Sequence, residues 1–228
     1  MNALILAAGI GTRLRPFTKD IPKCLVPVNG TPIIERQITF LKEKGIQEIT
    51  VVSGYKADRL NYLISKYGVE IVFNENYARY NNIYSLYSVL DKFGDTYIIE
   101  GDVWMEQNCF RTELEFSTYF ACRKEFYRNE WGLIINEKQK LKSIVIGDGT
   151  GYLMSGISYW KKEDCNIIAS QLRLKIRNSD FEKLYWDHIV LDVMNQLTIQ
   201  VLPVNGIYEI DTVTEWHQIQ KGCPSSRF

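Results

Sequence analysis

A chain of 228 residues is long enough to build one large domain with a sizeable core. Its 46% apolar and 24% charged residues are ordinary for a globular protein and exclude the disordered and fibrous classes. Because 27 Lys and Arg balance 27 Asp and Glu, no overall charge draws the protein to nucleic acid or to an anionic membrane, and any anion site must be local.

The chain begins with an apolar run at residues 3–6 that ends in a glycine-containing loop. Gly9 and Gly11 let the backbone approach a ligand closely, because glycine has no Cβ. Arg13 and Lys23 follow at short range, and two cations beside such a loop suit a polyphosphate. No Gly-Lys-Ser/Thr follows and the third glycine of the dinucleotide fingerprint is missing, so both common phosphate motifs are disfavoured.

Helical and strand patterns then alternate. The spacing predicts helices over 32–44 and 57–67, each closed by a glycine, and strands over 46–53, 69–73 and 97–102. This alternation predicts a mainly parallel sheet with helices on both faces. A ligand of such a sheet sits outside the carboxyl ends of the strands, where the glycine loop, the turn at Gly54 and the acidic residue Asp102 are expected.

From residue 116 the pattern changes. Strand-like pieces at 116–123, 131–136, 141–146 and 152–160, joined by polar turns such as 147–149, predict an antiparallel arrangement. We expect helices over 162–177, 181–197 and 211–221, and strands over 199–203 and 207–209. Earlier in the chain, Asn81 is a candidate cap for a helix that begins near Asn82.

Residues 6–28 resemble the signature of the nucleotidyltransferases that make sugar nucleotides and CDP-alcohols. The family pattern is L-A-A-G-x-G-[ST]-R-L-x-P-[LF]-T followed by x-x-P-K-x-L-[VL]-P-[VI], and every position is filled here. The resemblance implies a Rossmann-like α/β fold in which Arg13 and Lys23 hold the triphosphate of an NTP. The predicted nucleotide-binding residues are Leu6, Ala7, Ala8, Gly9, Gly11, Thr12, Arg13, Lys23, Gly54, Asn82 and Ser85.

Nucleotidyl transfer joins two anions, so it needs cations and a divalent metal rather than a covalent nucleophile. Mg²⁺ prefers carboxylate and phosphate oxygens. The resemblance implies that Asp102 and Asp211 hold Mg²⁺ and that Arg13, Lys23, Asp102 and Asp211 are the catalytic residues. Taken alone, Asp211 is equally a candidate cap for the last helix.

The second half of the chain mixes aromatic side chains with carboxylates, as in Asn129-Glu130-Trp131, residues 185–187 and residues 208–209. Aromatic faces beside carboxylates suit a cationic headgroup, although single aromatic residues are more often core. These motifs, with 80–82 and 84–86, are similar to those of the bacterial phosphocholine cytidylyltransferases. That similarity implies CTP as donor and the acceptor-binding residues Trp131, Tyr185, Asp187, Tyr208 and Glu209.

The chain has no internal repeat and no low-complexity segment, so we predict one domain over 1–221, with a nucleotide-binding part (1–115), a small antiparallel acceptor-binding lobe (116–221) and a tail or linker over 222–228. Phosphocholine is the favoured acceptor. 2-Aminoethylphosphonate is the first alternative, since both acceptors are zwitterionic. A sugar 1-phosphate and a non-catalytic nucleotide-binding role are the further alternatives.

Five cysteines, odd in number and without a C-x-x-C pair, argue against a disulfide framework or a zinc site. The N-terminus lacks a basic region before an apolar core, and no run of about 18 apolar residues occurs. We therefore predict a cytoplasmic protein without membrane insertion or a nucleic-acid partner. The tail at 222–228 is consistent with fusion to, or association with, an enzyme of the same pathway. The sequence also allows a homo-oligomer.

Overall fold

The computed structural model describes residues 1–178 and 180–221. The described strands are β1 (Asn2–Ala7), β2 (Pro27–Val28), β3 (Thr31–Pro32), β4 (Ile49–Ser53), β5 (Glu70–Phe73), β6 (Thr96–Glu100), β7 (Val103–Met105), β8 (Ser117–Ile135), β9 (Leu141–Trp160), β10 (Ile199–Pro203) and β11 (Ile207–Glu209). The described α-helices are α1 (Ile33–Glu43), α2 (Tyr62–Tyr67), α3 (Asn82–Tyr87), α4 (Lys162–Asn178), α5 (Asp187–Val193) and α6 (Val213–Gln220).

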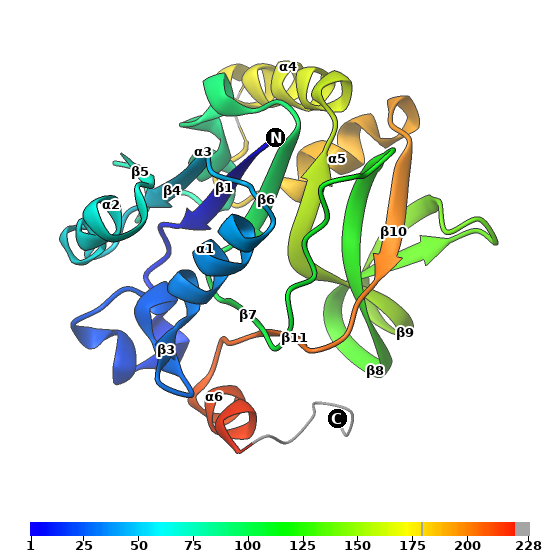
Figure 1. Ribbon diagram of the computed structural model, residues 1–228. Helices are drawn as coiled ribbons and strands as arrows, with labels where there is room; N and C mark the ends of the chain where they lie inside the picture. Colours follow the sequence, from blue (N-terminus) through cyan, green and yellow to red (C-terminus); the bar gives the residue numbers. More distant parts are fainter. Residues whose placement is uncertain (179, 222–228) are drawn as a thin grey trace.

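One mixed sheet organises the fold. Within the described residues it has seven strands in the order β10-β8-β9-β6-β1-β4-β5, with β5 and β10 at its two edges (Figure 1). Strand β9 runs antiparallel to its neighbours β6 and β8, and every other neighbouring pair is parallel. The predicted α/β fold with a mainly parallel sheet is therefore confirmed.

The alternation of side chains along β1 divides the core into two layers. Leu4 and Leu6 belong to a buried cluster with residues of α3, α4 and α5, whereas Ala3 and Ile5 belong to a cluster with residues of α1 and α2. Successive residues of a strand point to opposite faces of the sheet, so a strand covered on both sides is apolar throughout. Helices on both faces, as predicted, follow from this pattern.

The first half of the chain follows the predicted order closely. The helix expected over 32–44 is α1, and the one over 57–67 is a short 3₁₀ helix (Ala57–Leu60) followed by α2. Gly45 and Gly68 adopt positive φ angles of 78° and 65° just after these helices. Glycine reaches this conformation without steric cost, which is why it marks helix ends in the sequence.

The strand pieces predicted after residue 116 are joined into two long strands. The turn expected at 147–149 is wrong, because Gly147 pairs with Glu130 and Gly149 with Tyr127 inside the β8-β9 ribbon. The ribbon reverses instead at 136–140, where the Asn136 side chain accepts hydrogen bonds from two backbone N–H groups. Positive φ angles at Asn129, Gly147 and Gly151 bend the ribbon without ending it. The small antiparallel lobe is thus an extension of two sheet strands.

The helix predicted over 181–197 begins only at Asp187. Residues 181–186 are held in a non-helical path by four consecutive residues, 79–82. These contacts are Arg79 with Glu182, Tyr80 with Phe181, the Asn81 amide with the carbonyl of Lys183, and the Asn82 amide oxygen with the backbone N–H of Trp186. Contacts of this kind between distant segments override the local helical pattern.

The last helix is capped by Thr212, not by Asp211. The Thr212 side chain accepts from the Glu215 backbone, and Glu215 in turn accepts from the Thr212 N–H, which forms a complete capping box. Asp211 lies before the N-cap residue, so its carboxylate is not needed to cap the start of the helix. The alternative interpretation of Asp211 as the cap is therefore wrong.

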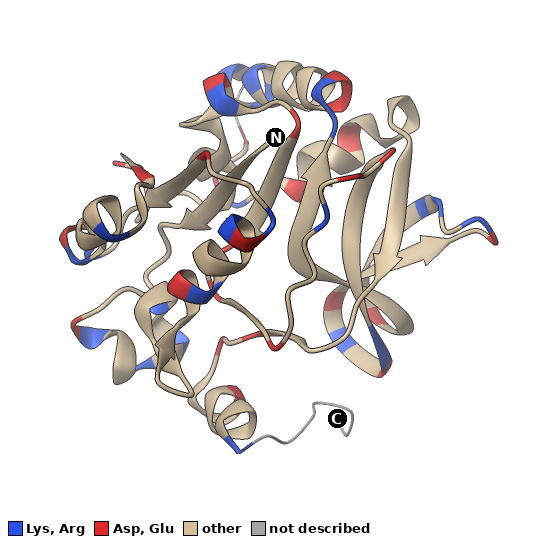
Figure 2. Ribbon diagram, viewed as in Figure 1, with Lys and Arg blue, Asp and Glu red and all other residues tan. Residues whose placement is uncertain are grey.

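Lys and Arg are interspersed with Asp and Glu along elements such as α4 (Figure 2), so the balanced charge is spread in both signs. Cys24 and Cys165 are buried and Cys109 and Cys122 are half-buried. No helix in the described ranges combines the length and apolar character needed to cross a bilayer. The tail or linker expected at 222–228 lies outside the described residues.

The turn after β4 packs against the glycine loop. The Tyr55 N–H donates to the carbonyl of Ala8 at 3.0 Å, and the Asn74 N–H donates to the carbonyl of Ser53 at 2.8 Å. A Cβ at Gly54 would lie 2.5 Å from the Tyr77 Cβ and 2.6 Å from the Ala8 oxygen. Gly54 is therefore required for close packing of three segments.

We predict that Gly54→Ala lowers the free energy of unfolding by about 1–3 kcal/mol, because the added methyl group overpacks a rigid backbone contact. Urea unfolding measures the change. Gly94→Ala is the control, since its Cβ would meet only the Lys162 side chain at 3.7 Å. Equal stability of the two variants would contradict the prediction.

Candidate active site

A cavity of about 820 Å³ lies at the carboxyl ends of β1 and β6. Its lining includes the loop after β1, the start of α3, the turn after β6, the bent part of β8 and residues 185–187. Strands β1 and β6 are parallel neighbours, so their carboxyl ends open at the same edge of the sheet. This is the position predicted for a ligand of an open α/β sheet.

The glycine loop forms one wall of the cavity. Gly11 adopts a φ angle of 64°, and a Cβ there would lie 3.0 Å from the Cβ of Lys23. The Thr18 hydroxyl donates to the Gly11 carbonyl at 2.7 Å. The loop and the segment that carries Lys23 thus pack directly on each other.

Lys23 connects two carboxylates that come from distant parts of the chain. Its Nζ lies 2.5 Å from Asp102 Oδ2 and 2.5 Å from Asp211 Oδ1. Burial alone lowers the pKa of Lys23, but the charges of Asp102 and Asp211 outweigh burial and raise it above the ordinary value. Arg13 adds a third contact, 2.8 Å from Asp211 Oδ1, while its side chain stays 69% exposed.

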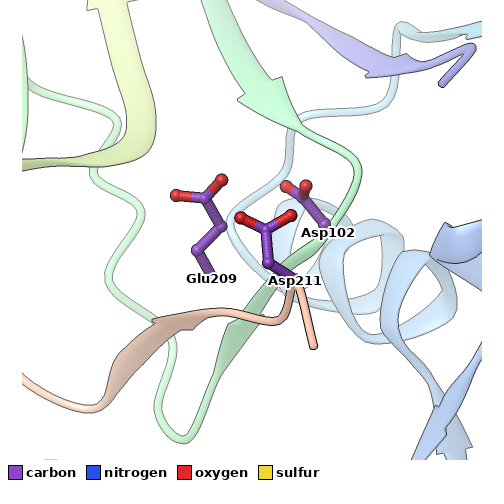
Figure 3. A group of neighbouring side chains, drawn as sticks. All are labelled: Asp102, Glu209 and Asp211. Atoms are coloured by element: carbon purple, nitrogen blue, oxygen red, sulfur yellow. The ribbon is translucent and has the colours of Figure 1, made fainter. Parts of the chain in front are cut away.

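Asp102, Glu209 and Asp211 form a group in which one ligand atom of each lies within 4.8 Å of the others (Figure 3). They come from the turn after β6, the end of β11 and the segment before α6. The buried oxygen Asp102 Oδ1 has no hydrogen-bond partner among the described residues. Carboxylate oxygens with an unused buried ligand atom fit a divalent cation.

The carboxylates of the cavity perturb one another. The charge of Asp102, with burial and the charge of Asp211, raises the pKa of Glu209 to about 8. Glu100 lies two residues before Asp102, and burial together with the charges of Asp102, Asp187 and Glu209 raises its pKa well above the ordinary range. Such mutual repulsion is typical of sites that bind cations.

One end of the cavity is aromatic. Trp131 lies edge-on to Tyr185, with 6.4 Å between the ring centroids, and Tyr185 is 46% exposed. His188 packs at 4.8 Å from Trp131 and stacks on Tyr185 at 6.0 Å, so it supports both rings from outside the cavity lining.

Asp187 is the acidic group at this aromatic end. It is the first residue of α5, and its Oδ1 accepts a hydrogen bond of 2.9 Å from the Tyr119 hydroxyl. Burial raises the pKa of Asp187 to about 7, although the bond from Tyr119 acts in the opposite direction. A carboxylate enclosed in this way favours a cationic ligand that replaces its lost hydration.

The structure brings most of the sequence-predicted residues to this one cavity. Those that line it are Leu6, Ala7, Ala8, Gly9, Gly11, Thr12, Arg13, Lys23, Asn82, Ser85, Asp102, Trp131, Tyr185, Asp187, Glu209 and Asp211. Gly54 and Tyr208 do not line it. Gly54 packs behind Ala8. Tyr208 neighbours Glu209 in β11, so the two side chains face opposite ways, and Tyr208 packs with the cluster that contains Leu14 and Trp104.

Several further lining residues are not among the predicted site residues; the polar or aromatic ones include Glu100, Tyr119, Glu130 and Trp186. Glu100 could have been found, because a strand residue two places before Asp102 points to the same side of the sheet. Tyr119 carries no such signal, since it lies in the buried first part of β8 and only the fold brings it to Asp187.

Comparisons with known proteins agree with this geometry. Residues 3–103 match the MobA-like NTP transferase domain. The chain is 43% identical to a choline-phosphate cytidylyltransferase of Streptococcus pneumoniae over 97% of both chains. It is 35% identical to a 2-aminoethylphosphonate cytidylyltransferase of Lancefieldella rimae, over 94% of this chain and 89% of that one. The solved structure of the S. pneumoniae CTP:phosphocholine cytidylyltransferase matches with a TM-score of 0.94 and 42% identity, over 96% and 97% of the two chains.

Asp187 should make stability depend on pH. Its folded pKa of about 7 exceeds the ordinary 3.8, so the folded protein binds this proton more tightly than the unfolded chain does. The stability it contributes is present below pH 4 and is lost as the pH rises to about 7. We predict that the free energy of unfolding of the unaltered protein falls over this interval relative to that of Asp187→Asn.

Urea unfolding of the two proteins, at several pH values across that interval, measures this difference. Asparagine keeps an oxygen that accepts from Tyr119, so the variant retains the hydrogen bond and loses only the titration. A difference that does not change with pH would contradict the prediction.

Proposed function

Because the chain belongs to the nucleotidyltransferase family that includes the choline-phosphate and 2-aminoethylphosphonate cytidylyltransferases, we propose that it transfers CMP from CTP to phosphocholine, with release of pyrophosphate. One observation carries this proposal. The signature loop and the cation–carboxylate group share a single cavity with an aromatic and acidic group of Trp131, Tyr185 and Asp187. A polyphosphate and a cationic headgroup can therefore be held together.

Arg13 and Lys23 are proposed to bind the triphosphate. Lys23 is enclosed by Asp102 and Asp211, whereas the exposed Arg13 can turn toward an incoming phosphate. The backbone of residues 7–11 lies along the same wall and offers N–H groups to the nucleotide. Asn82 and Ser85 line the cavity near the start of α3 and complete the proposed nucleotide contacts.

Asp102 and Asp211 are proposed to hold Mg²⁺, with Glu209 beside them. The family generally uses a divalent metal, and the unpartnered Asp102 Oδ1 supports this assignment. When bound, Mg²⁺ would neutralise charge on the phosphate oxygens of the nucleotide. Lys23, in contact with both aspartates, adds a fixed positive charge at the same place.

The aromatic end is proposed to orient the acceptor. Trp131 and Tyr185 offer ring faces to a trimethylammonium group, and Asp187 and Glu209 supply countercharges. The headgroup fixed there directs the phosphate oxygen toward the α-phosphorus of CTP, so that positioning supplies much of the rate. This oxygen is largely anionic near neutral pH, so no general base is required.

2-Aminoethylphosphonate is the second candidate acceptor, favoured by the relative that acts on it. Its primary ammonium needs hydrogen-bond acceptors, which Asp187 and Glu209 offer, and makes less use of the ring faces. We also propose that residues 1–221 act as one catalytic domain and that the enzyme works in the cytoplasm.

A panel of acceptors tests the proposal. Pyrophosphate release is measured with Mg²⁺ and CTP against phosphocholine, phosphoethanolamine, 2-aminoethylphosphonate and glucose 1-phosphate. We expect phosphocholine to give the highest kcat/KM, and Asp102→Asn to reduce turnover with every acceptor by at least about 100-fold, as loss of an electrostatic group in a site of this kind does. Preference for the phosphonate would select the second candidate, and turnover of glucose 1-phosphate alone would contradict both.

Trp131→Ala tests the aromatic end. Since a cation over an aromatic ring contributes about 0.5–2 kcal/mol, the KM for phosphocholine should rise by about 2- to 30-fold while the KM for CTP stays unchanged. In Trp131→Phe the KM for phosphocholine should rise less, because an aromatic ring remains at this position. Phe126→Ala is the matched control, because Phe126 is an exposed aromatic residue of the same strand that does not line the cavity. An unchanged KM in Trp131→Ala would refute the assignment.

A further inference from the structure

Glu100 lies between the nucleotide end and the acceptor end of the cavity. It is the last residue of β6, and a single oxygen, Oε1, accepts from the Asn82 amide at 2.8 Å and from the Trp186 indole N–H at 3.3 Å. Asn82 begins α3 on the nucleotide side, and Trp186 directly precedes Asp187 on the acceptor side. One carboxylate oxygen therefore joins the two ends.

A third hydrogen bond closes the arrangement into a ring. The backbone N–H of Trp186 donates to the Asn82 side-chain oxygen at 3.0 Å, so Asn82 contacts both Glu100 and Trp186. Any displacement of Asn82 therefore changes the contacts of Trp186. Trp186 is 2% exposed and packs edge-on against Trp160, so its indole has little freedom to adjust.

Space for Glu100 is created by a glycine. Gly156 in β9 adopts a φ angle of 74°, and a Cβ there would lie 3.3 Å from the Glu100 Cβ and 2.5 Å from a Val103 methyl group. The segments on either side are also joined elsewhere, since residues 79–82 contact residues 181–186 at four successive positions. Glu100 lines the cavity and contacts one residue of each segment, Asn82 and Trp186.

We propose that Glu100 is a positioning residue that couples the two substrate sites. A nucleotide that contacts Asn82 orients its amide, and through Glu100 and the Trp186 N–H it fixes the segment that carries Tyr185 and Asp187. Nucleotide and acceptor then each bind more tightly in the presence of the other, and by linkage the factor is the same in both directions. The inference rests on the proposed function, because it requires an acceptor at residues 185–187.

Binding measurements test the coupling directly. The dissociation constant of phosphocholine is measured by calorimetry with and without α,β-methylene CTP, which cannot transfer CMP, in the presence of Mg²⁺. In the unaltered protein the analogue should lower this constant by about 5- to 50-fold. Glu100→Ala should reduce the factor to less than about twofold. Glu100→Gln should restore it, because an amide oxygen can accept the same two hydrogen bonds.

A merely structural role would not give this result. Partial unfolding of a variant weakens binding with and without the analogue alike, so the ratio of the two constants is unaffected. Glu106→Ala is the matched control, since this carboxylate accepts from Tyr208 away from the cavity lining. Unchanged coupling in Glu100→Ala would overturn the proposal.

If Glu100→Ala does not fold, the same coupling factor is measured in Trp186→Phe. Phenylalanine keeps the aromatic packing and removes the indole donor, so the coupling factor should fall at least about twofold, as loss of one hydrogen bond implies. Unchanged coupling in this variant would equally overturn the proposal.

If the acceptor panel shows that phosphocholine is not the substrate, the proposed acceptor fails and the same ratios are measured with the acceptor that turns over. A factor below about two in the unaltered protein would then count against Glu100 itself.

Discussion

The close approach of three carboxylates is the constraint on which the rest of the site depends. One ligand atom each of Asp102, Glu209 and Asp211 lies within 4.8 Å of the others in the cavity, and repulsion between these like charges raises the pKa of Glu209. Lys23 offsets this repulsion by contacting two of the three at 2.5 Å. A group of carboxylates that repel one another suits a cation, and the same Lys23 connects it to the glycine loop, where Gly11 packs against Lys23.

The fold has to hold these groups from segments far apart in the sequence. Asp102 follows the central strand β6. Asp211 does not cap helix α6, because Thr212 and Glu215 form the capping box. Helix α6 is fixed in turn to the start of the chain: Trp216 packs on Phe17 at 4.6 Å between ring centroids, and its indole N–H donates to the carbonyl of Pro27 at 2.7 Å. The far end of the domain thereby positions Asp211 against Arg13 and Lys23. This explains why a helix that lines no part of the cavity is needed for its geometry.

Sequence patterns predicted the mainly parallel sheet, the first two helical segments and a large share of the polar cavity lining, because local periodicity and the signature loop carry that information. They did not predict that residues 181–186 leave the helix, since the reason lies in contacts with residues 79–82 about a hundred positions away. Tyr208 does not line the cavity for a simpler reason: adjacent strand residues point to opposite faces, and Glu209 of that pair faces the cavity. Gly54 was assigned to the nucleotide, yet its missing Cβ makes room for Tyr77 and Ala8. Composition and spacing identify the residue types of a site, but the partners of each side chain are set by long-range packing.

The bent β8-β9 ribbon completes the acceptor end by a similar principle. After the bend at Asn129, Gly132 pairs with Leu153 as well as Val145, so the strand folds back over its own sheet. Added Cβ atoms at Gly132 and Gly149 would lie 2.2 Å and 2.7 Å from the Tyr127 hydroxyl, so both glycines make room for that ring. The fold-back carries Trp131 to Tyr185 and places it opposite the cation-bearing loop in one cavity. The cavity therefore contains two cations, Arg13 and Lys23, in contact with carboxylates, and a separate carboxylate, Asp187, beside the aromatic rings. In the proposed complex the ammonium of a zwitterion would lie toward Asp187, and a divalent cation held by the three carboxylates would offset their charge where the phosphorus group approaches Arg13 and Lys23. An uncharged sugar ring would leave the Asp187 carboxylate without a countercharge, which disfavours a neutral headgroup.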